Sequence, residues 1–222
     1  MTGRILAIGD IHGCLTAFEM LLGTMEICPE DQLITLGDYI DRGPDSKGVI
    51  ERLIRLRSEC RLSPILGNHE EMLLLARKED QPNMLTMWLR SGGAATLDSY
   101  GFRTRPNELP EEHIAFVESC FPYFETESHA FLHANYDADK PIDALHGYTL
   151  RWESLRERIP ARHISGKTFI VGHTPQSSGE ILDRGYLKCI DTQCYAGGWL
   201  TGIDVVSGKI WQANEQGELR TR

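Results

Sequence analysis

The sequence lacks the cysteine pattern of a disulfide-stapled or zinc-binding protein. Its six cysteines are scattered along 222 residues, and no pair forms a Cys-x-x-Cys motif. A chain of this length can bury a substantial core without covalent staples. We therefore expect reduced thiols that are mostly buried, as is typical of a cytoplasmic protein.

Long apolar runs and an excess of basic residues are also missing. No apolar stretch approaches the roughly 20 residues that a membrane-spanning helix needs. The chain passes from Met1 through Arg4 into the short apolar run 5–8, which is too short for the core of a signal peptide. The net charge of −9 argues against a general nucleic-acid binder, because phosphate contacts need a basic surface. We expect neither a membrane nor a nucleic-acid partner.

Internal repeats and low-complexity tracts are absent as well. Hydrophobic residues make up 41% of the chain and charged residues 25%, the ordinary balance of a globular protein. Glycine, proline and asparagine lie between the periodic segments as punctuation. The pattern predicts one domain over residues 1–222, and we expect a monomer.

What is present, in the first third of the chain, is an alternation of apolar runs and helical patterns. Runs at 4–8, 33–36 and 62–66 predict strands, and each is followed by a polar cluster. Helical periodicity follows at 15–25, after Ser46 as a candidate cap, and at 72–76. This order predicts parallel strands with helical crossovers, in which ligands bind at the carboxyl edge.

The remainder of the chain has two further patterns. Residues 79–128 predict a mainly helical insertion or cap, in which Met84, Met87, Trp88 and Leu89 form an apolar stripe that we assign to the core. From Ala130 onward, short strands separated by turn residues predict antiparallel hairpins. The expected result is one sheet with parallel and antiparallel parts, or two packed sheets.

The densest cluster is the stretch 37–43, Gly-Asp-Tyr-Ile-Asp-Arg-Gly, directly after the second predicted strand. Two carboxylates and a guanidinium at this position would be costly to bury as ordinary packing. They suit a metal and phosphate site on a strand-end loop.

Similar polar clusters follow five predicted strands. They are Asp10 with His12, Asp38 with Asp41 and Arg42, Asn68 with His69, His133, and His173. Carboxylate, imidazole and amide oxygen suit a divalent metal with mixed nitrogen and oxygen ligands, such as manganese, iron or zinc. The number of ligands fits two metal ions better than one, as in the two-metal sites that catalyse in-line displacement.

Three of these clusters resemble the signature motifs of the phosphoprotein phosphatase family of calcineurin-like metallophosphoesterases. The motifs are Gly9-Asp-Ile-His-Gly13, Gly37-Asp-Tyr-Ile-Asp-Arg-Gly43 and Gly67-Asn-His-Glu70, and His133-Ala134 and Gly172-His-Thr174 are similar to the two later histidine motifs. The resemblance covers about residues 4–204. It is strongest to small bacterial and phage serine/threonine phosphatases and to symmetrical diadenosine tetraphosphatases. It implies a mixed α/β fold, with a central sandwich of mixed sheets flanked by helices and the helical insertion around 79–128.

The resemblance also implies a role for each matching residue. Asp10 and His12 hold the first metal, Asp38 bridges, and Asn68, His133 and His173 hold the second, with Mn²⁺ favoured and iron or zinc as alternatives. A hydroxide between the ions attacks phosphorus. Arg42 binds phosphoryl oxygens with help from Asn68, and His69 protonates the leaving oxygen while Asp41 orients its ring.

One family feature has no clean counterpart here. Many members carry a second phosphate-binding arginine near a Leu-Trp pair, and this chain has Leu150-Arg151-Trp152 followed by Arg156. Arg151 is the candidate for phosphate binding, although a surface position suits it equally well and Arg156 is the other possibility.

The predicted function is metal-dependent hydrolysis of phosphomonoesters in phosphoserine and phosphothreonine proteins. One alternative is symmetrical hydrolysis of diadenosine tetraphosphate or another nucleotide, for which Trp88, Tyr100 and Phe102 could supply stacking aromatics. A second alternative is a metal-binding regulatory module without catalysis, which would have no need of the His69 and Asp41 pair.

Overall fold

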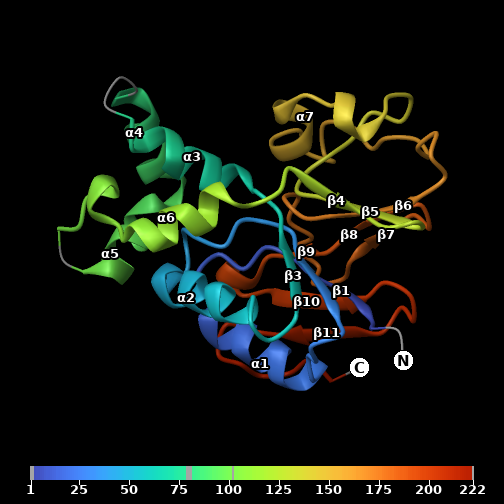
Figure 1. Cartoon of the computed structure of the whole chain (residues 1–222), viewed down its shortest axis with the longest axis horizontal. Helices are drawn as coiled ribbons and strands as arrows, with labels where there is room; N and C mark the ends of the chain where they lie inside the picture. Colours follow the sequence, from blue (N-terminus) through green and yellow to red (C-terminus); the bar gives the residue numbers. More distant parts are fainter. Residues whose placement is uncertain (1–2, 79–81, 102, 222) are drawn as a thin grey trace.

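The strands of the protein form two mixed sheets (Figure 1). This computed structural model describes residues 3–78, 82–101 and 103–221. Over these residues the first sheet has six strands, in the order β11-β10-β1-β2-β3 with β9 paired to β10. The second has five, in the order β4-β5-β6-β8-β7. The mixed α/β class and the two-sheet arrangement expected from the sequence are confirmed.

The strands are short. Their bounds are β1 Ile5–Ile8, β2 Gln32–Thr35, β3 Arg61–Pro64, β4 Tyr123–Glu125, β5 His129–Leu132, β6 Thr168–Val171, β7 Leu182–Asp183, β8 Leu187–Cys189, β9 Asp191–Thr192, β10 Trp199–Asp204 and β11 Ile210–Ala213. The α-helices are α1 Leu15–Met25, α2 Ser46–Leu56, α3 Asn68–Ala76, α4 Pro82–Trp88, α5 Ala94–Tyr100, α6 Glu111–Glu118 and α7 Gly147–Arg151. A π-helix, η1 Leu89–Gly93, joins α4 to α5, and 3₁₀ turns occupy η2 Pro106–Glu108, η3 Ile142–Ala144 and η4 Cys194–Ala196.

Parallel pairing brings the polar clusters to one edge. In the first sheet β1, β2 and β3 are parallel, and in the second sheet β5 is parallel to β6. The amide of Leu36 bonds to Ile8 and that of Gly172 bonds to His133, so that neighbouring strand ends stay aligned. The five clusters that follow these strands therefore lie at corresponding ends of the two sheets.

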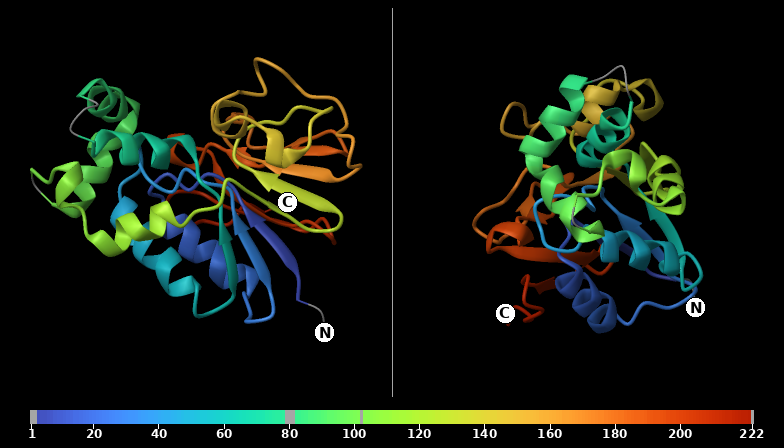
Figure 2. Two further views of the ribbon diagram at one scale, coloured as in Figure 1. Left: turned by 45° about the horizontal axis from the view of Figure 1, so that its top comes forward. Right: turned by 90° about the vertical axis from the view of Figure 1, so that its left-hand side faces the viewer.

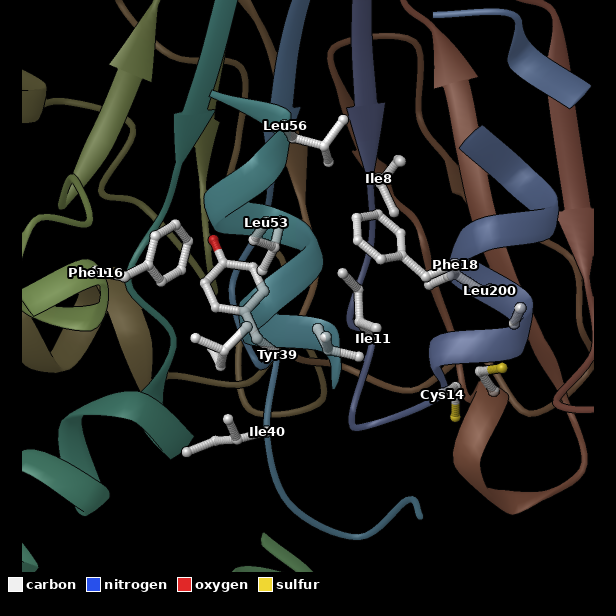
Figure 3. Close-up of a cluster of buried hydrophobic side chains, with 14 of the residues drawn as sticks. Ile8, Ile11, Cys14, Phe18, Tyr39, Ile40, Leu53, Leu56, Phe116 and Leu200 are labelled. Atoms are coloured by element: carbon white, nitrogen blue, oxygen red, sulfur yellow. The ribbon is translucent and has the colours of Figure 1, made fainter. Parts of the chain in front are cut away.

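Alternating side chains of each strand enter different apolar layers. Ala7 and Ile34 of the first sheet share a buried layer with Phe131 and Ile170 of the second, and this layer fills the space between the sheets. Leu6 and Ile8 face α1 and α2 instead. Figure 3 shows Phe18 of α1 close to Ile8 on this outer side. Figure 2 shows α1 and α2 on the outer side of the first sheet, with α7 beyond the second sheet. Because both faces are covered, these strands are continuous apolar runs.

The region 79–128 is mainly helical, as expected, but its last part is not. Helices α4, α5 and α6 gather with α3 at one end of the sheets (Figure 1), whereas Tyr123–Glu125 is the edge strand β4. The apolar stripe is divided: Trp88 is fully buried, while Met87 and Leu89 are exposed. The core assignment holds for Trp88 and is wrong for Met87 and Leu89.

Two other expectations are wrong. Asp45, and not Ser46, caps α2, because the Asp45 carboxylate accepts the amide of Gly48 at 2.8 Å, whereas the Ser46 hydroxyl accepts the amide of Asp41. The last third is also more than a series of hairpins, since β8 pairs parallel to β6 across a connection that includes β7.

All six cysteines are free thiols, and four are buried. Among the described residues, no helix combines the length and hydropathy that crossing a membrane requires.

Candidate active site

The loop 37–43 is held in an unusual backbone conformation by a buried carboxylate. Asp38, Asp41 and Arg42 have φ of 50°, 73° and 71°, values that residues other than glycine rarely adopt because they cost conformational free energy. Hydrogen bonds from the loop to Glu70 offset this conformational cost. Its carboxylate accepts the backbone amides of Asp38 and Tyr39, both at 2.8 Å, together with those of Ile40 and Gly67 at 3.3 and 3.1 Å. Glu70 closes the motif Gly67-Asn-His-Glu70, and the sequence alone assigns it no role. Its position three residues after a helix-capping glycine was the available signal.

One group of possible metal ligands comprises His12, Asp38 and His69. Their ligand atoms all lie within 4.8 Å of one another, and all three side chains are buried. The Nδ1 of His12 lies 2.9 Å from the carbonyl of Ile40, to which it donates. That contact turns Nε2 toward the carboxylate of Asp38, whose Oδ2 is 3.5 Å away. The ring is therefore fixed in the orientation that a metal ligand needs.

The second group comprises Asp38, His133 and His173, again within 4.8 Å. His133 donates from Nδ1 to the carbonyl of Leu36 at 2.7 Å, and its Nε2 lies 3.4 Å from Oδ1 of Asp38. The amide oxygen of Asn68 lies 2.9 Å from this Nε2 and 3.0 Å from Nδ1 of His173. Asp38 thus belongs to both groups and turns a different oxygen to each.

Asp10 lies beside these groups. Its carboxylate accepts the backbone amide of His173 at 3.0–3.1 Å, and a Cβ at Gly172 would lie 2.0 Å from Oδ1, so only glycine fits there. Burial, together with the nearby charge of Asp191, raises the pKa of Asp10 well above its usual value. Burial also raises the pKa of Asp191 to about 6. Asp191 is not among the residues predicted from the sequence, although it lies two residues after the end of β8, Leu187–Cys189, which was the available signal.

This donor set fits divalent cations. Three buried carboxylates, Asp10, Asp38 and Asp191, lie among imidazoles, and buried charges are stable only when they are paired or coordinate a metal. Burial would raise the pKa of Asp38, but the imidazoles of His133 and His69 hold it well below its usual value. Oxygen and nitrogen donors in these proportions suit manganese, iron or zinc.

His69, a member of the first group, forms a hydrogen-bonded pair with Asp41. The Nδ1–H of His69 donates to Oδ2 of Asp41 at 2.6 Å, so that Nε2 faces Asp38 at 3.9 Å. Asp41 belongs to neither ligand group. Burial lowers the pKa of His69, but the charge of Asp38 and the hydrogen bond with Asp41 outweigh this effect and raise it above its usual value.

Two further residues of the helical region contact Asp41. The indole Nε1 of Trp88 lies 2.9 and 3.1 Å from its two carboxylate oxygens, and the hydroxyl of Thr96 lies 2.6 Å from Oδ1. The sequence pattern predicts Trp88 as a core residue or a stacking aromatic and gives no signal for Thr96, because both lie about 50 residues from Asp41 along the chain.

Arg42 lies at the open side of the site. Its side chain is exposed, its guanidinium carbon is 4.6 Å from the ring centre of Tyr195, and Nη1 lies 2.9 Å from Nε2 of His12. Tyr195 also meets His12 edge to face at 4.8 Å. Tyr195 comes from the turn η4 and is not among the residues predicted from the sequence.

Unlike Arg42, Arg151 is paired with a carboxylate of α3. At the end of α7, its Nη2 donates to Glu71 of α3 at 2.5 Å, and Trp152 donates to the same carboxylate at 2.6 Å. Its Nε is buried without a hydrogen-bond partner. Arg156 donates to the carbonyl of Pro175 at 3.0 Å. Phosphate binding by Arg151, with Arg156 as the alternative, stays a prediction.

The aromatic residues considered for adenine stacking are occupied or not described. Trp88 is fully buried, and the hydroxyl of Tyr100 lies 2.8 Å from Nδ1 of His113. Phe102 lies outside the described residues. The described part of the helical region therefore offers no free stacking surface at Trp88.

Comparisons with known proteins agree with this geometry. The family model for calcineurin-like phosphoesterases matches residues 3–196. Serine/threonine-protein phosphatase 1 of Salmonella typhimurium is 34% identical over 221 residues, covering 89% of this chain and 90% of the relative. A symmetrical bis(5'-nucleosyl)-tetraphosphatase of an Acidovorax species is 48% identical over 73 residues, which is 32% of this chain and only 25% of that relative.

Solved structures show the same fold at low sequence identity. A structure described as a candidate diadenosine tetraphosphatase has a TM-score of 0.72 and 20% identity, covering 96% of this chain and 94% of the other. A cold-active protein-tyrosine phosphatase of a psychrophilic Shewanella has a TM-score of 0.62 and 16% identity, covering 100% of this chain and 80% of the other.

Proposed function

Because this chain belongs to the calcineurin-like phosphoesterase family, whose members use a dinuclear metal centre, we propose that it is a serine/threonine protein phosphatase. Residues 1–222 form one metallophosphoesterase domain in this proposal. The observation that carries it is the pair of ligand groups that share Asp38, together with the hydrogen bond from His69 of the first group to Asp41. The relative from Salmonella, which matches nearly end to end, supports the protein substrate.

In this proposal the metal ligands divide between two positions. Asp10 and His12 hold one ion, Asn68, His133 and His173 hold the other, and Asp38 is common to both. When bound, two divalent ions, with Mn²⁺ favoured, supply Lewis-acid activation of water and of the phosphoryl group. Their four positive charges exceed the three negative charges of the buried carboxylates Asp10, Asp38 and Asp191, and Arg42 adds a further positive charge. An anionic phosphate can therefore enter a protein that is acidic overall.

The remaining residues bind phosphate and move a proton. Arg42 binds phosphoryl oxygens from the open side of the site, with Asn68 as a second donor, and Arg151 is carried as a further candidate. His69 donates the proton on Nε2 to the leaving oxygen, while Asp41 fixes the ring through Nδ1–H. A positioned acid is important because an alkoxide leaves poorly unless it is protonated.

The alternative substrate is a dinucleoside polyphosphate. It is favoured by the Acidovorax relative, whose matching 73 residues are more similar than those of the phosphatase. A purely regulatory metal-binding module is less well supported, since a binder has no use for the buried His69 and Asp41 pair. The cytoplasmic location and the monomeric state stay predictions from the sequence.

The test is a comparison of substrates with purified protein supplied with Mn²⁺. We expect release of phosphate from phosphoserine and phosphothreonine peptides and none after chelation. Faster turnover of diadenosine tetraphosphate than of any peptide would transfer the assignment to the nucleotide substrate. Failure to hydrolyse either substrate or p-nitrophenyl phosphate would contradict the enzymatic proposal altogether.

A further inference from the structure

The helical segment that contains α4, η1 and α5 has an unusual contact with the catalytic loop. Trp88 is fully buried at the end of α4, but its ring is not enclosed only by apolar side chains. Its indole N–H is directed at Asp41 and lies 2.9 Å from Oδ2 and 3.1 Å from Oδ1. A buried indole N–H requires an acceptor, and here that acceptor is the carboxylate that also accepts the hydrogen bond from Nδ1–H of His69.

Thr96 of α5 contacts Asp41 twice. Its hydroxyl lies 2.6 Å from Oδ1, and the backbone amide of Asp41 donates to the same hydroxyl at 2.9 Å. Asp41 has a φ of 73°, a conformation that persists only when surrounding contacts hold it. One buried hydroxyl thus contacts both the carboxylate and the backbone amide of this residue, and the amide is shared with the hydroxyl of Ser46 at 3.0 Å.

The segment between Trp88 and Thr96 also contacts Arg42, the residue that follows Asp41 in the loop. The amide of Arg42 donates to the carbonyl of Gly92 at 3.2 Å. Gly92 has a φ of 119°, and a Cβ there would lie 2.7 Å from Cγ of Arg42. The segment therefore packs directly on the backbone of both Asp41 and Arg42.

We propose that Trp88 and Thr96 are positioning residues that keep Oδ2 of Asp41 directed at His69 and thereby adapt the enzyme to alkyl phosphoesters. This inference rests on the proposed function. Three donors surround the carboxylate, namely the imidazole, the indole and the hydroxyl, and together they fix its rotation. If the indole and hydroxyl are lost, the carboxylate can turn away from Nδ1, and the imidazole is no longer held in place to protonate the leaving oxygen.

The leaving group separates this role from simple packing. Serine and threonine alkoxides need protonation in order to leave, whereas p-nitrophenolate is a stable anion and needs little help. Loss of a positioning contact should therefore reduce turnover of a phosphoserine peptide much more than turnover of p-nitrophenyl phosphate. Loss of packing alone should reduce both equally.

The experiment compares Trp88→Phe, which keeps an aromatic ring without the N–H, with Thr96→Val and its conservative partner Thr96→Ser. For Trp88→Phe and Thr96→Val we expect kcat on the peptide to fall about 10- to 100-fold, within the range of general-acid effects, and the loss to exceed that on p-nitrophenyl phosphate by at least about tenfold. Thr96→Ser should restore most of the activity. Met87→Ala changes an exposed side chain of the same helix and is the matched control.

A spectroscopic measurement completes the test independently of turnover. In protein loaded with diamagnetic Zn²⁺, the Nδ1 proton of His69 should give a downfield resonance that is missing in His69→Asn. We expect it to move or broaden in Trp88→Phe and Thr96→Val and to return in Thr96→Ser. An unchanged resonance, or equal losses on both substrates, would overturn the inference. If the wild type hydrolyses neither substrate, the proposed function fails, and the resonance still decides whether these residues position His69.

Discussion

Buried carboxylates stand at both ends of β1 and β2, and their surroundings differ. At the amino ends, Asp31 accepts Nε of Arg4 at 3.1 Å and the backbone amides of Arg4 and Cys28 at 3.0 Å. Although burial opposes ionisation, these bonds lower the pKa of Asp31 to about 2. At the carboxyl ends, Asp38 lies 3.4–3.9 Å from the imidazoles of His12, His69 and His133, and among the described residues neither Asp10 nor Asp38 forms an ion pair with a lysine or an arginine. At the amino end protein groups alone pair with the carboxylate, whereas at the carboxyl end the carboxylates and imidazoles form a donor set that suits divalent cations.

The largest effect should come from removing the residue common to both ligand groups. We expect Asp38→Asn to lower bound metal and to reduce turnover by more than about 10⁴-fold, the upper range for loss of a general acid, because both ions lose a ligand. Elemental analysis and a phosphopeptide assay measure the two quantities. Full metal content with near-normal turnover would show that the carboxyl end does not differ from the amino end in this way.

The next effect separates proton delivery from metal binding. His69→Asn should reduce turnover of a phosphoserine peptide about 10²–10⁴-fold while two metal ions stay bound. Asp41→Asn should act in the same direction, since an amide cannot replace the carboxylate as the acceptor for all three donors. Loss of metal from Asp41→Asn protein would argue that Asp41 is itself a ligand.

A smaller effect is expected at the buried acid that supports the loop. In Glu70→Gln, one carboxylate oxygen that accepts backbone amides is replaced by a donor, and the loop around Asp38 loses its support. We expect metal affinity to fall about 10- to 100-fold, the usual range for residues that orient ligands. Metal titration followed by calorimetry measures this. Glu71→Gln, which alters the neighbouring carboxylate that faces Arg151, is the matched control and should leave metal affinity within about threefold.

The smallest effect on activity should come from the amino end. Asp31→Asn should leave turnover unchanged and lower the free energy of unfolding at pH 7 by about 1–2 kcal/mol, a value reduced for the partial exposure of Arg4. Because the folded pKa of Asp31 lies below its unfolded value of about 3.8, the stabilisation is complete well above pH 4 and disappears as the pH falls through about 2. Urea unfolding of both proteins at pH 7 and at pH 3 measures the difference, which should shrink at the lower pH. A constant difference would mean that ionisation of Asp31 does not stabilise the fold.

The sequence was sufficient where function depends on local order. Apolar runs followed by polar clusters predicted the parallel strands and the common edge, because strand direction and the side-chain period are local properties. It was insufficient where function depends on distant partners. Trp88 and Thr96 lie 47 and 55 residues from Asp41, and no periodicity connects them. The parallel pairing of β8 with β6 was not predicted for the same reason, since short strands separated by turns do not reveal which strand each one pairs with.

The contacts of Gly92 and Thr96 with the loop have a consequence for how such proteins can be recombined. A cap that merely covers a site can be exchanged between relatives as a self-contained module. Here the segment from Trp88 to Thr96 and the loop 41–42 share hydrogen bonds and a close backbone approach, so they must be inherited together. A chimera that takes the helical region from another family member should succeed only when its loop comes from the same parent.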